Sequence, residues 1–158
     1  MDLTKMGQKI EQYLRGADYE VKTVAEPDHD GGAWMCRDTG SEVDFFISVE
    51  SNEDDLQIPT VTIGAIIETF DPKDPESALD FETTLGYLDL AGSLIGSSIT
   101  ITRFGLDGLP FAAVVNRVPI EQFELEMIED LLNFNFSQIA SLTGIDTEDE
   151  PSLGDNGV

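Results

Sequence analysis

The sequence predicts a single α+β domain in which helices flank an antiparallel sheet, in the order α-β-β-β(-β)-α-β-β-α. Two observations predict this class. Segments with apolar residues at helical spacing occur at the start, middle and end of the 158-residue chain, and segments of alternating polarity lie between them. The alternating segments come in pairs joined by turn-forming residues, so no parallel crossover is needed to explain them.

The first half of the chain is expected to form one helix and then three or four strands. Leu3, Met6, Ile10 and Leu14 make one apolar stripe, and Gly16 stands where a helix usually ends. Alternating or continuously apolar residues predict strands over 19–25, 33–37, 42–50 and 56–67. Turn-forming residues separate them at 26–32, 38–41 and 51–55.

A second helix and a hairpin follow. The helix is expected to run from Glu76 or Ser77 to about Gly92. Its inward residues are expected to include Leu79, Leu85 and Leu88. Strands at 97–104 and 109–118 enclose an Asp-Gly pair, which is a strong hairpin signal. Ile99 and Ile101 are expected to face the core, with Thr100 and Thr102 more exposed.

A long closing helix and a tail complete the prediction. The helix is expected from Pro119 to Leu142, because Pro suits a first helical turn and apolar residues follow at helical spacing. These residues form its predicted inward stripe: Ile120, Phe123, Met127, Ile128, Leu131, Phe134 and Ile139. Gly144 is a natural terminator. Residues 1–144 are therefore expected to form the domain. Residues 145–158, with five acids and little to bury, are expected to be an acidic disordered tail.

The charge of the chain excludes several classes of partner. With 32 acidic and 8 basic side chains, the formal net charge is −24. Such a chain repels phosphate, so neither nucleic acid nor an anionic membrane surface is an expected partner. The apolar stretches are too short to cross a bilayer. One cysteine cannot form an internal disulfide, and no signal-peptide pattern occurs, so the cytoplasm is the expected location.

Candidate chemical groups are few and dispersed. His29 is the only histidine and Cys36 the only cysteine, so the chain has too few ligands for a zinc site and can offer a single Cys-His pair at most. Alternation along the predicted strand puts Cys36 on one face with Trp34, and puts Met35 on the other, and a buried cysteine is usually inert. The acidic turns at 28–30 and 71–76 could bind calcium weakly, but neither follows the EF-hand pattern. No phosphate-binding loop is present. We therefore expect no catalytic residue, no metal and no cofactor, and a protein that is not an enzyme.

The order of the predicted elements and the content of the last two-thirds of the chain resemble a known family. The similarity lies in the stretch Leu85–Ser93, in Ile99–Arg103, in the Asp-Gly turn at 107–108 and in residues 111–118, followed by the closing helix. These features resemble the type III secretion chaperone-like fold and, within it, the YbjN-like family. The resemblance covers the pattern of about residues 3–142. It implies a non-enzymatic domain that binds protein partners, often as a dimer, and it names no active site.

The closing helix supplies candidate partner-binding residues. Leu125, Leu132 and Phe136 fall outside its main apolar stripe, and a helix that is apolar on more than one side is central in a core or lies at an interface. We take these residues as candidates for a homodimer or partner surface. The expected partner is a basic or amphipathic protein segment, selected by the surrounding carboxylates.

Three explanations of the acidity remain open. A halophilic adaptation to a salt-rich cytoplasm would keep the surface hydrated while salt screens the repulsion. An acidic binding face would attract basic partners. Imitation of DNA phosphates would make the chain an inhibitor of a nucleic-acid-binding protein, which is the alternative function. The acids are spread over the predicted loops and strands, which favours the first explanation over the third.

The net charge of −24 predicts a strong dependence of stability on salt. Self-repulsion acts over a Debye length of roughly 30 Å at 0.01 M salt and roughly 3 Å at 1 M. The Tm should therefore rise between dilute buffer and about 1 M salt, which a thermal melt followed by circular dichroism measures. A flat profile would contradict salt adaptation.

Overall fold

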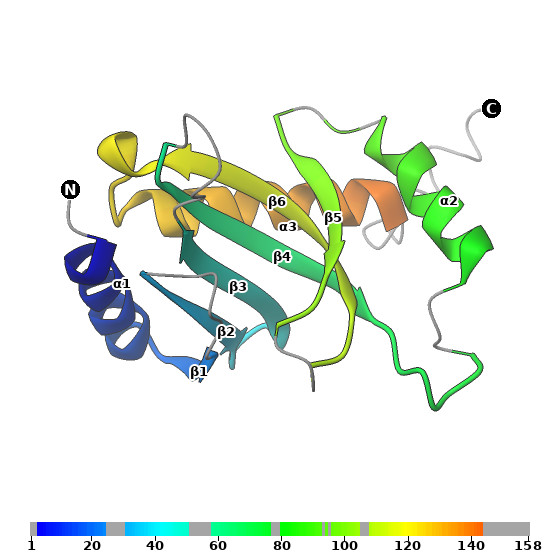
Figure 1. Ribbon diagram of the computed structural model, residues 1–158, viewed down its shortest axis with the longest axis horizontal. Helices are drawn as coiled ribbons and strands as arrows, with labels where there is room; N and C mark the ends of the chain where they lie inside the picture. The colour runs from blue at the N-terminus through cyan, green and yellow to red at the C-terminus, as the bar shows by residue number, and fades with distance from the viewer. Residues whose placement is uncertain are drawn as a thin grey trace, which may run out of the picture.

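The computed structural model describes residues 3–24, 31–50, 58–76, 80–92, 94, 96–104 and 108–143. Its elements, drawn in Figure 1, are α1 (Leu3–Gly16), β1 (Tyr19–Val24), β2 (Gly32–Asp38), β3 (Val43–Glu50), β4 (Thr60–Thr69), α2 (Phe81–Ala91), β5 (Ser98–Thr102), β6 (Phe111–Pro119), the 3₁₀ turn η1 (Ile120–Gln122) and α3 (Met127–Thr143). The predicted α+β class and order are confirmed. The expected acidic tail at 145–158 lies outside the described residues.

The strands of the described residues form one six-stranded antiparallel sheet. Their order across the sheet is β1-β2-β3-β4-β6-β5. The first four strands follow one another as a meander. The chain then passes through α2 to β5 at the sheet edge, and β6 returns between β5 and β4. The two strands of the hairpin expected over 97–118 pair antiparallel, with Ile99 opposite Val114, and Asp107 of the expected turn lies outside the described residues.

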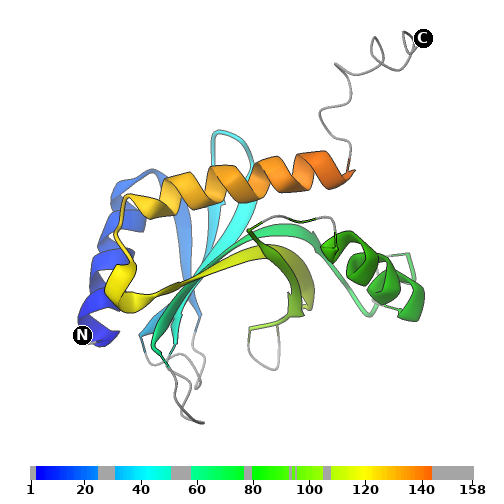
Figure 2. The same cartoon turned by 90° about the horizontal axis from the view of Figure 1, so that it is seen from above.

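The helices of the described residues all pack on one face of this sheet. α1 covers β1 to β3, and α3 covers β4 and β6 (Figure 2). α2 lies at the far end of the same face, beside β5. The side chains between these layers form the main core, whose fully buried members include Ile10, Leu14, Phe45, Ile47, Val61, Ile63 and Ile128. Each such side chain contributes about 1.5–3 kcal/mol when removed from water.

α1 lies close to the sheet because Gly7 has no side chain. A Cβ atom at Gly7 would lie 1.8 Å from the carbonyl oxygen of Gly31. Beside this contact, the indole Nε1 of Trp34 donates to Glu11 Oε1 at 2.9 Å, and Arg15 pairs with the same carboxylate at 3.4 Å. The bond from Trp34 is the main cause that lowers the pKa of Glu11. These contacts hold α1 on β2.

The opposite face, which we call the open face, has its own aromatic cluster. It carries no helix among the described residues, and the sheet is visibly curved (Figure 2). Phe46, Phe104 and Phe111 pack there with ring centroids 5.2, 5.5 and 5.6 Å apart. Phe46 and Phe111 are each only 3% exposed. The two sheet faces therefore have separate apolar clusters.

A buried polar network joins α3 to the start of β5. Asn135 is fully buried, and its Nδ2 donates to the carbonyl oxygen of Ile63 at 3.4 Å. Its Oδ1 accepts a bond of 3.1 Å from the Ser97 hydroxyl, and Asn116 Nδ2 donates to the carbonyl of Gly96 at 2.6 Å. A buried amide left without partners would cost about 1–3 kcal/mol. The network therefore fixes the place where the chain enters β5.

The closing helix is shorter than predicted. Pro119 ends β6, η1 follows it, and α3 begins only at Met127. Phe123 adopts an extended conformation, with φ −79° and ψ 134°, which separates η1 from α3. The interruption lets Phe123 and Ile120 reach the main core from outside the helix. The continuous helix expected over 119–142 is therefore wrong in its first part.

β5 shows a weaker alternation than expected. Ile99 and Ile101 pack toward Tyr87 and the core on the helix side. Thr100 and Thr102 were expected to be more exposed than the isoleucines, yet all four residues are half-buried. The reason is the position of the strand, because an edge strand leaves both of its faces partly open.

Gly64 allows the aromatic cluster of the open face to form, and its replacement tests that packing. A Cβ atom at Gly64 would lie 2.2 Å from Cε1 of Phe46. We predict that Gly64→Ala lowers the free energy of unfolding by about 1–3 kcal/mol, because the ring or the strand must move. Urea denaturation measures the change.

Gly86→Ala is the matched control for this substitution. Gly86 lies within α2, and a Cβ atom there would meet nothing within 4 Å. The control should raise stability by about 0.5–1 kcal/mol, because Ala is the better helix former. Unchanged stability of Gly64→Ala would show that Phe46 is not held against the glycine.

Candidate functional site

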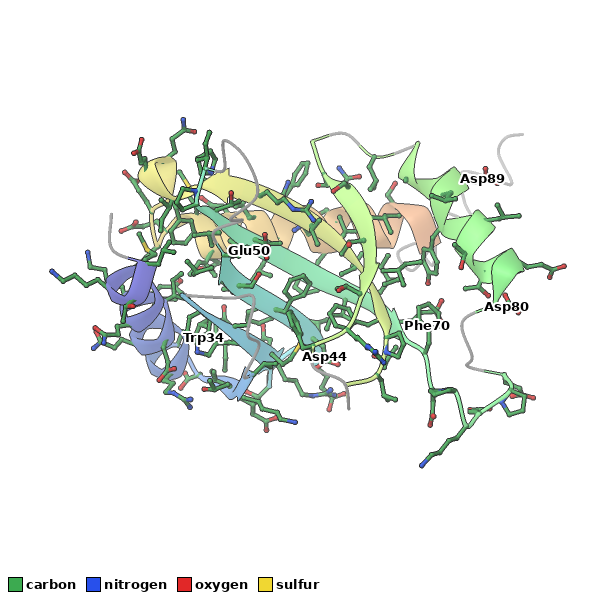
Figure 3. The ribbon with its side chains drawn as sticks, viewed as in Figure 1. Trp34, Asp44, Glu50, Phe70, Asp80 and Asp89 are labelled. Carbon is green, nitrogen blue, oxygen red and sulfur yellow. The ribbon has the colours of Figure 1, made fainter. Side chains whose placement is uncertain are left out.

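The helix α2 begins at a well-formed N-cap. Asp80 Oδ1 accepts a hydrogen bond of 2.7 Å from the backbone N–H of Thr83, and its carbonyl oxygen accepts one of 2.9 Å from the Thr84 hydroxyl. The bond from Thr83 is the main cause that lowers the pKa of Asp80. α2 therefore begins later than the predicted start at Glu76. Figure 3 marks Asp80 at this end of the helix and Asp89 near the other end.

The inner side of α2 is anchored by a tyrosine. Tyr87 is 8% exposed, and its ring meets Phe70 edge-on with centroids 6.1 Å apart. Its hydroxyl donates a hydrogen bond to the Glu68 carboxylate. Burial, with the bond and the negative charge of Glu68, raises the pKa of Tyr87 well above its ordinary value. Tyr87 and Leu90 pack on the cluster at Ala112, which sets the side of α2 that faces the sheet.

The outer side of α2 carries two exposed leucines. Leu85 is 45% exposed and Leu88 is 64% exposed. Three residues apart, they share one side of the helix, and the exposed carboxylates Glu82 and Asp89 lie on the same side. We call these four residues the α2 outer face. A single exposed leucine needs no explanation, but two on one turn, edged by carboxylates, make a small amphipathic surface.

The inward orientation predicted for Leu85 and Leu88 is wrong. α2 has two apolar stripes, and the sheet takes the one that contains Tyr87 and Leu90. Tyr87 can reach both the Phe70 ring and the Glu68 carboxylate, which a leucine cannot do. Leu79, which was also expected to face inward, lies outside the described residues.

The residues predicted to bind a partner lie on or beside α3. Leu132 is 4% exposed and belongs to the main core with Ile128, so its predicted exposed position is wrong. Leu125, just before α3, and Phe136 are half-buried and pack against the same core. Partner binding by Leu125 and Phe136 stays a prediction. Phe134, expected in the inward stripe, is instead 40% exposed.

The buried side of α3 was predicted incorrectly for a simple reason. The predicted stripe was counted through Ile120 and Phe123, which reach the core from outside the helix. Counted within α3, the buried residues are spaced by three and four positions: Ile128, Leu132, Asn135 and Ile139. The burial of Asn135 was not predicted, because an analysis of apolar periodicity assigns polar residues to the exposed side of a helix. Its burial depends on partners distant in the chain.

The groups considered for metal binding do not converge. His29 lies outside the described residues. The carboxylates of Asp71 and Asp74 accept bonds of 2.9 and 3.0 Å from the backbone N–H groups of Lys73 and Glu76, a pattern typical of Asx turns. In the part of the chain that the structure describes, no three or more His, Cys, Asp or Glu side chains gather in a way that could hold a metal ion.

Cys36 is a core residue. It is 4% exposed and shares the helix-covered face with Trp34, whereas Met35 points to the open face, as the alternation predicted. Burial raises the pKa of the Cys36 thiol to about 12, and the positive charge of Arg15 opposes this only in part. A thiol in such surroundings is a poor nucleophile.

Comparisons with known proteins find no relative. No protein-family model matches the chain, and neither a curated protein nor a solved structure matches it. None of the helices in the described ranges has the length and apolar character needed to cross a bilayer. The candidate site therefore depends on its own geometry. It is placed at the α2 outer face because two of the five large apolar residues that are exposed in the described part of the chain lie together there.

We predict that Cys36 resists alkylation in the folded protein. With a pKa of about 12, only about one thiol in 10⁴ is ionised at pH 8, and the side chain is covered. Iodoacetamide should not label the native chain over hours at pH 8 but should label it fully in denaturant, as mass spectrometry would show. Fast labelling of the native protein would mean that β2 opens readily or that the thiol is activated.

Proposed function

We propose that this chain is a non-enzymatic protein-binding module, chaperone-like or regulatory, that works in the cytoplasm as a homodimer. Its partner would be a basic or amphipathic protein segment. The resemblance to the YbjN-like family and to secretion chaperones motivates the class. The observation that carries the proposal is the α2 outer face, where Leu85 and Leu88 stay exposed although the same helix buries Tyr87.

The chemistry of the α2 outer face favours a segment with both apolar and basic residues. Glu82 and Asp89 flank the two leucines, and α2 itself contains no basic residue. Apolar partner residues would cover Leu85 and Leu88, while Lys or Arg at the rim would meet the carboxylates. In a salt-rich cytoplasm the charges would be screened within roughly 3 Å at 1 M salt, so the apolar contact would carry most of the affinity.

A second region favours the alternative function, a DNA-mimic inhibitor. Five carboxylates are exposed around the start of α3, at Glu121, Glu124, Glu126, Glu129 and Asp130. Their negative charges act on a neighbouring residue. The pKa of Tyr13 is raised mainly by its burial and further by the charges of Glu129, Glu126 and Asp130. Such a surface would attract the basic site of a nucleic-acid-binding protein. This region contains no exposed leucine pair, so the two functions use different residues.

The proposal is tested with a synthetic amphipathic peptide of alternating Leu and Lys, labelled for fluorescence anisotropy. We predict that the double variant Leu85→Ser, Leu88→Ser, which adds no charge that could attract the lysines, binds it at least about tenfold more weakly, because losing the burial of one leucine costs on the order of 1.5 kcal/mol or more. Ile58→Ser is the control for removing an exposed apolar side chain, since Ile58 is 62% exposed and precedes β4, whose first residues lie at the opposite end of the sheet from α2 (Figure 1). The control should bind as the parent does.

The same assay separates the two functions. Peptide binding through the α2 outer face should persist in about 1 M salt, where charge attraction is screened. A DNA mimic would instead compete with duplex DNA for a basic DNA-binding protein, lose that competition at high salt, and be unaffected by the changes at Leu85 and Leu88. Equal peptide affinity of the parent and the double variant would contradict the proposed site.

A further inference from the structure

The strand β5 lies in the part of the sequence that is poorest in acids. No acidic residue occurs between Asp89 and Asp107, and Arg103 is the one charged residue there. This is unusual in a chain with 32 acids among 158 residues. Two copies that each carry −24 repel one another, and the repulsion between facing surfaces is weakest where carboxylates are absent. A contact between two copies is therefore favoured at this segment.

β5 also presents an unguarded sheet edge. No strand of the described residues lies beyond it, and Ser98–Thr102 contains neither a charge nor a proline. Natural edge strands usually carry such residues to block pairing with another chain. The opposite edge follows that rule, because β1 carries Glu20 and Lys22, and Arg15 donates to the Thr23 hydroxyl at 3.2 Å. Only one of the two edges is therefore suited to pairing.

The side chains of β5 leave room for another strand. Every residue of the strand keeps part of its surface exposed. Ile99 and Ile101 pack on the helix side with Tyr87, and Thr100 lies opposite Ala113 on the open face. A strand added at this edge would cover the remaining surface of the two isoleucines without disturbing the pairing with β6.

We infer that two copies of this chain pair through β5, antiparallel, about a two-fold axis at Thr100. The inference deepens the proposed function, because it names the surface that makes the homodimer. The strand has five residues, so a pairing centred on the middle one lets all five pair. Ser98 then faces Thr102 and Ile99 faces Ile101, which are favourable cross-strand pairs. A basic segment is a poor occupant here, since β5 itself carries no carboxylate.

Sedimentation equilibrium of the full chain in about 1 M salt tests the pairing, because that salt screens the repulsion between copies. The parent should be a dimer, and Thr100→Asp should raise its dissociation constant by about tenfold or more, since two carboxylates would face each other across the axis. Thr23→Asp, the same change on the other edge strand, should leave the dimer unchanged. A monomeric parent, or equal effects of the two variants, would overturn the inference.

A cross-link tests the position of the axis independently of stability. Facing residues of antiparallel strands have Cα atoms about 4.5–5.5 Å apart, within the range of a disulfide. Thr100→Cys should therefore give a covalent dimer on mild oxidation, whereas Thr23→Cys should not. The native Cys36 is buried and does not compete. Absence of the covalent dimer from Thr100→Cys, or its formation by both variants, would overturn the proposed axis.

The two proposals fail in different ways. Thr100→Asp should still bind the amphipathic peptide at the α2 outer face, and the double variant at Leu85 and Leu88 should still dimerise. Loss of peptide binding together with an intact dimer would remove the proposed binding site alone. A monomeric parent that binds the peptide would remove the homodimer and its β5 pairing, and would leave the peptide-binding site in place.

Discussion

Burial of one face of the sheet beneath the helices is the constraint on which the rest of this structure depends. Alternate residues of β3 and β4, such as Phe45, Ile47 and Ile63, leave water only if helices cover them. α1 can approach because Gly7 lacks a side chain, and α3 settles through Ile128 and the residues that follow it at helical spacing. Each helix therefore takes the orientation that buries this face of the sheet. Burial of each large apolar side chain stabilises the fold by about 1.5–3 kcal/mol.

The one-sided covering has consequences at the far end of the sheet. α2 meets β5 and β6 where the sheet ends, so it buries only the stripe at Tyr87 and Leu90 and leaves Leu85 and Leu88 in solvent. The chain enters β5 through a polar network rather than an apolar one. Exposed leucines, a helix held by a tyrosine and an uncharged edge strand thus gather in one region. That region is where the fold itself leaves surface for other molecules.

The extreme charge is compatible with this fold because it stays outside. The buried polar side chains among the described residues are Ser48, Thr62 and Asn135, all uncharged. Burying an unpaired carboxylate would cost far more than burying an amide that keeps its hydrogen bonds. The acids of the described residues therefore lie at the surface, on loops, on outer helix faces and on strand positions such as Glu20 and Asp44 that point to solvent. Their absence along β5 distinguishes that edge of the sheet from the other edge, where β1 carries Glu20.

The sequence by itself determined the class of fold, the element order and the alternation that places Trp34 and Cys36 together, because these follow from local periodicity. It could not determine which side of a doubly apolar helix meets the sheet. Leu85 and Leu88 are as apolar as Tyr87 and Leu90, so periodicity does not distinguish the two sides of α2. Leu132 was assigned to the wrong side of α3 because the predicted helical spacing was counted from residues that lie before the helix begins. Only the tertiary structure decided these orientations, because they depend on partners far away in the chain, such as Glu68 for Tyr87 and Ile63 for Asn135.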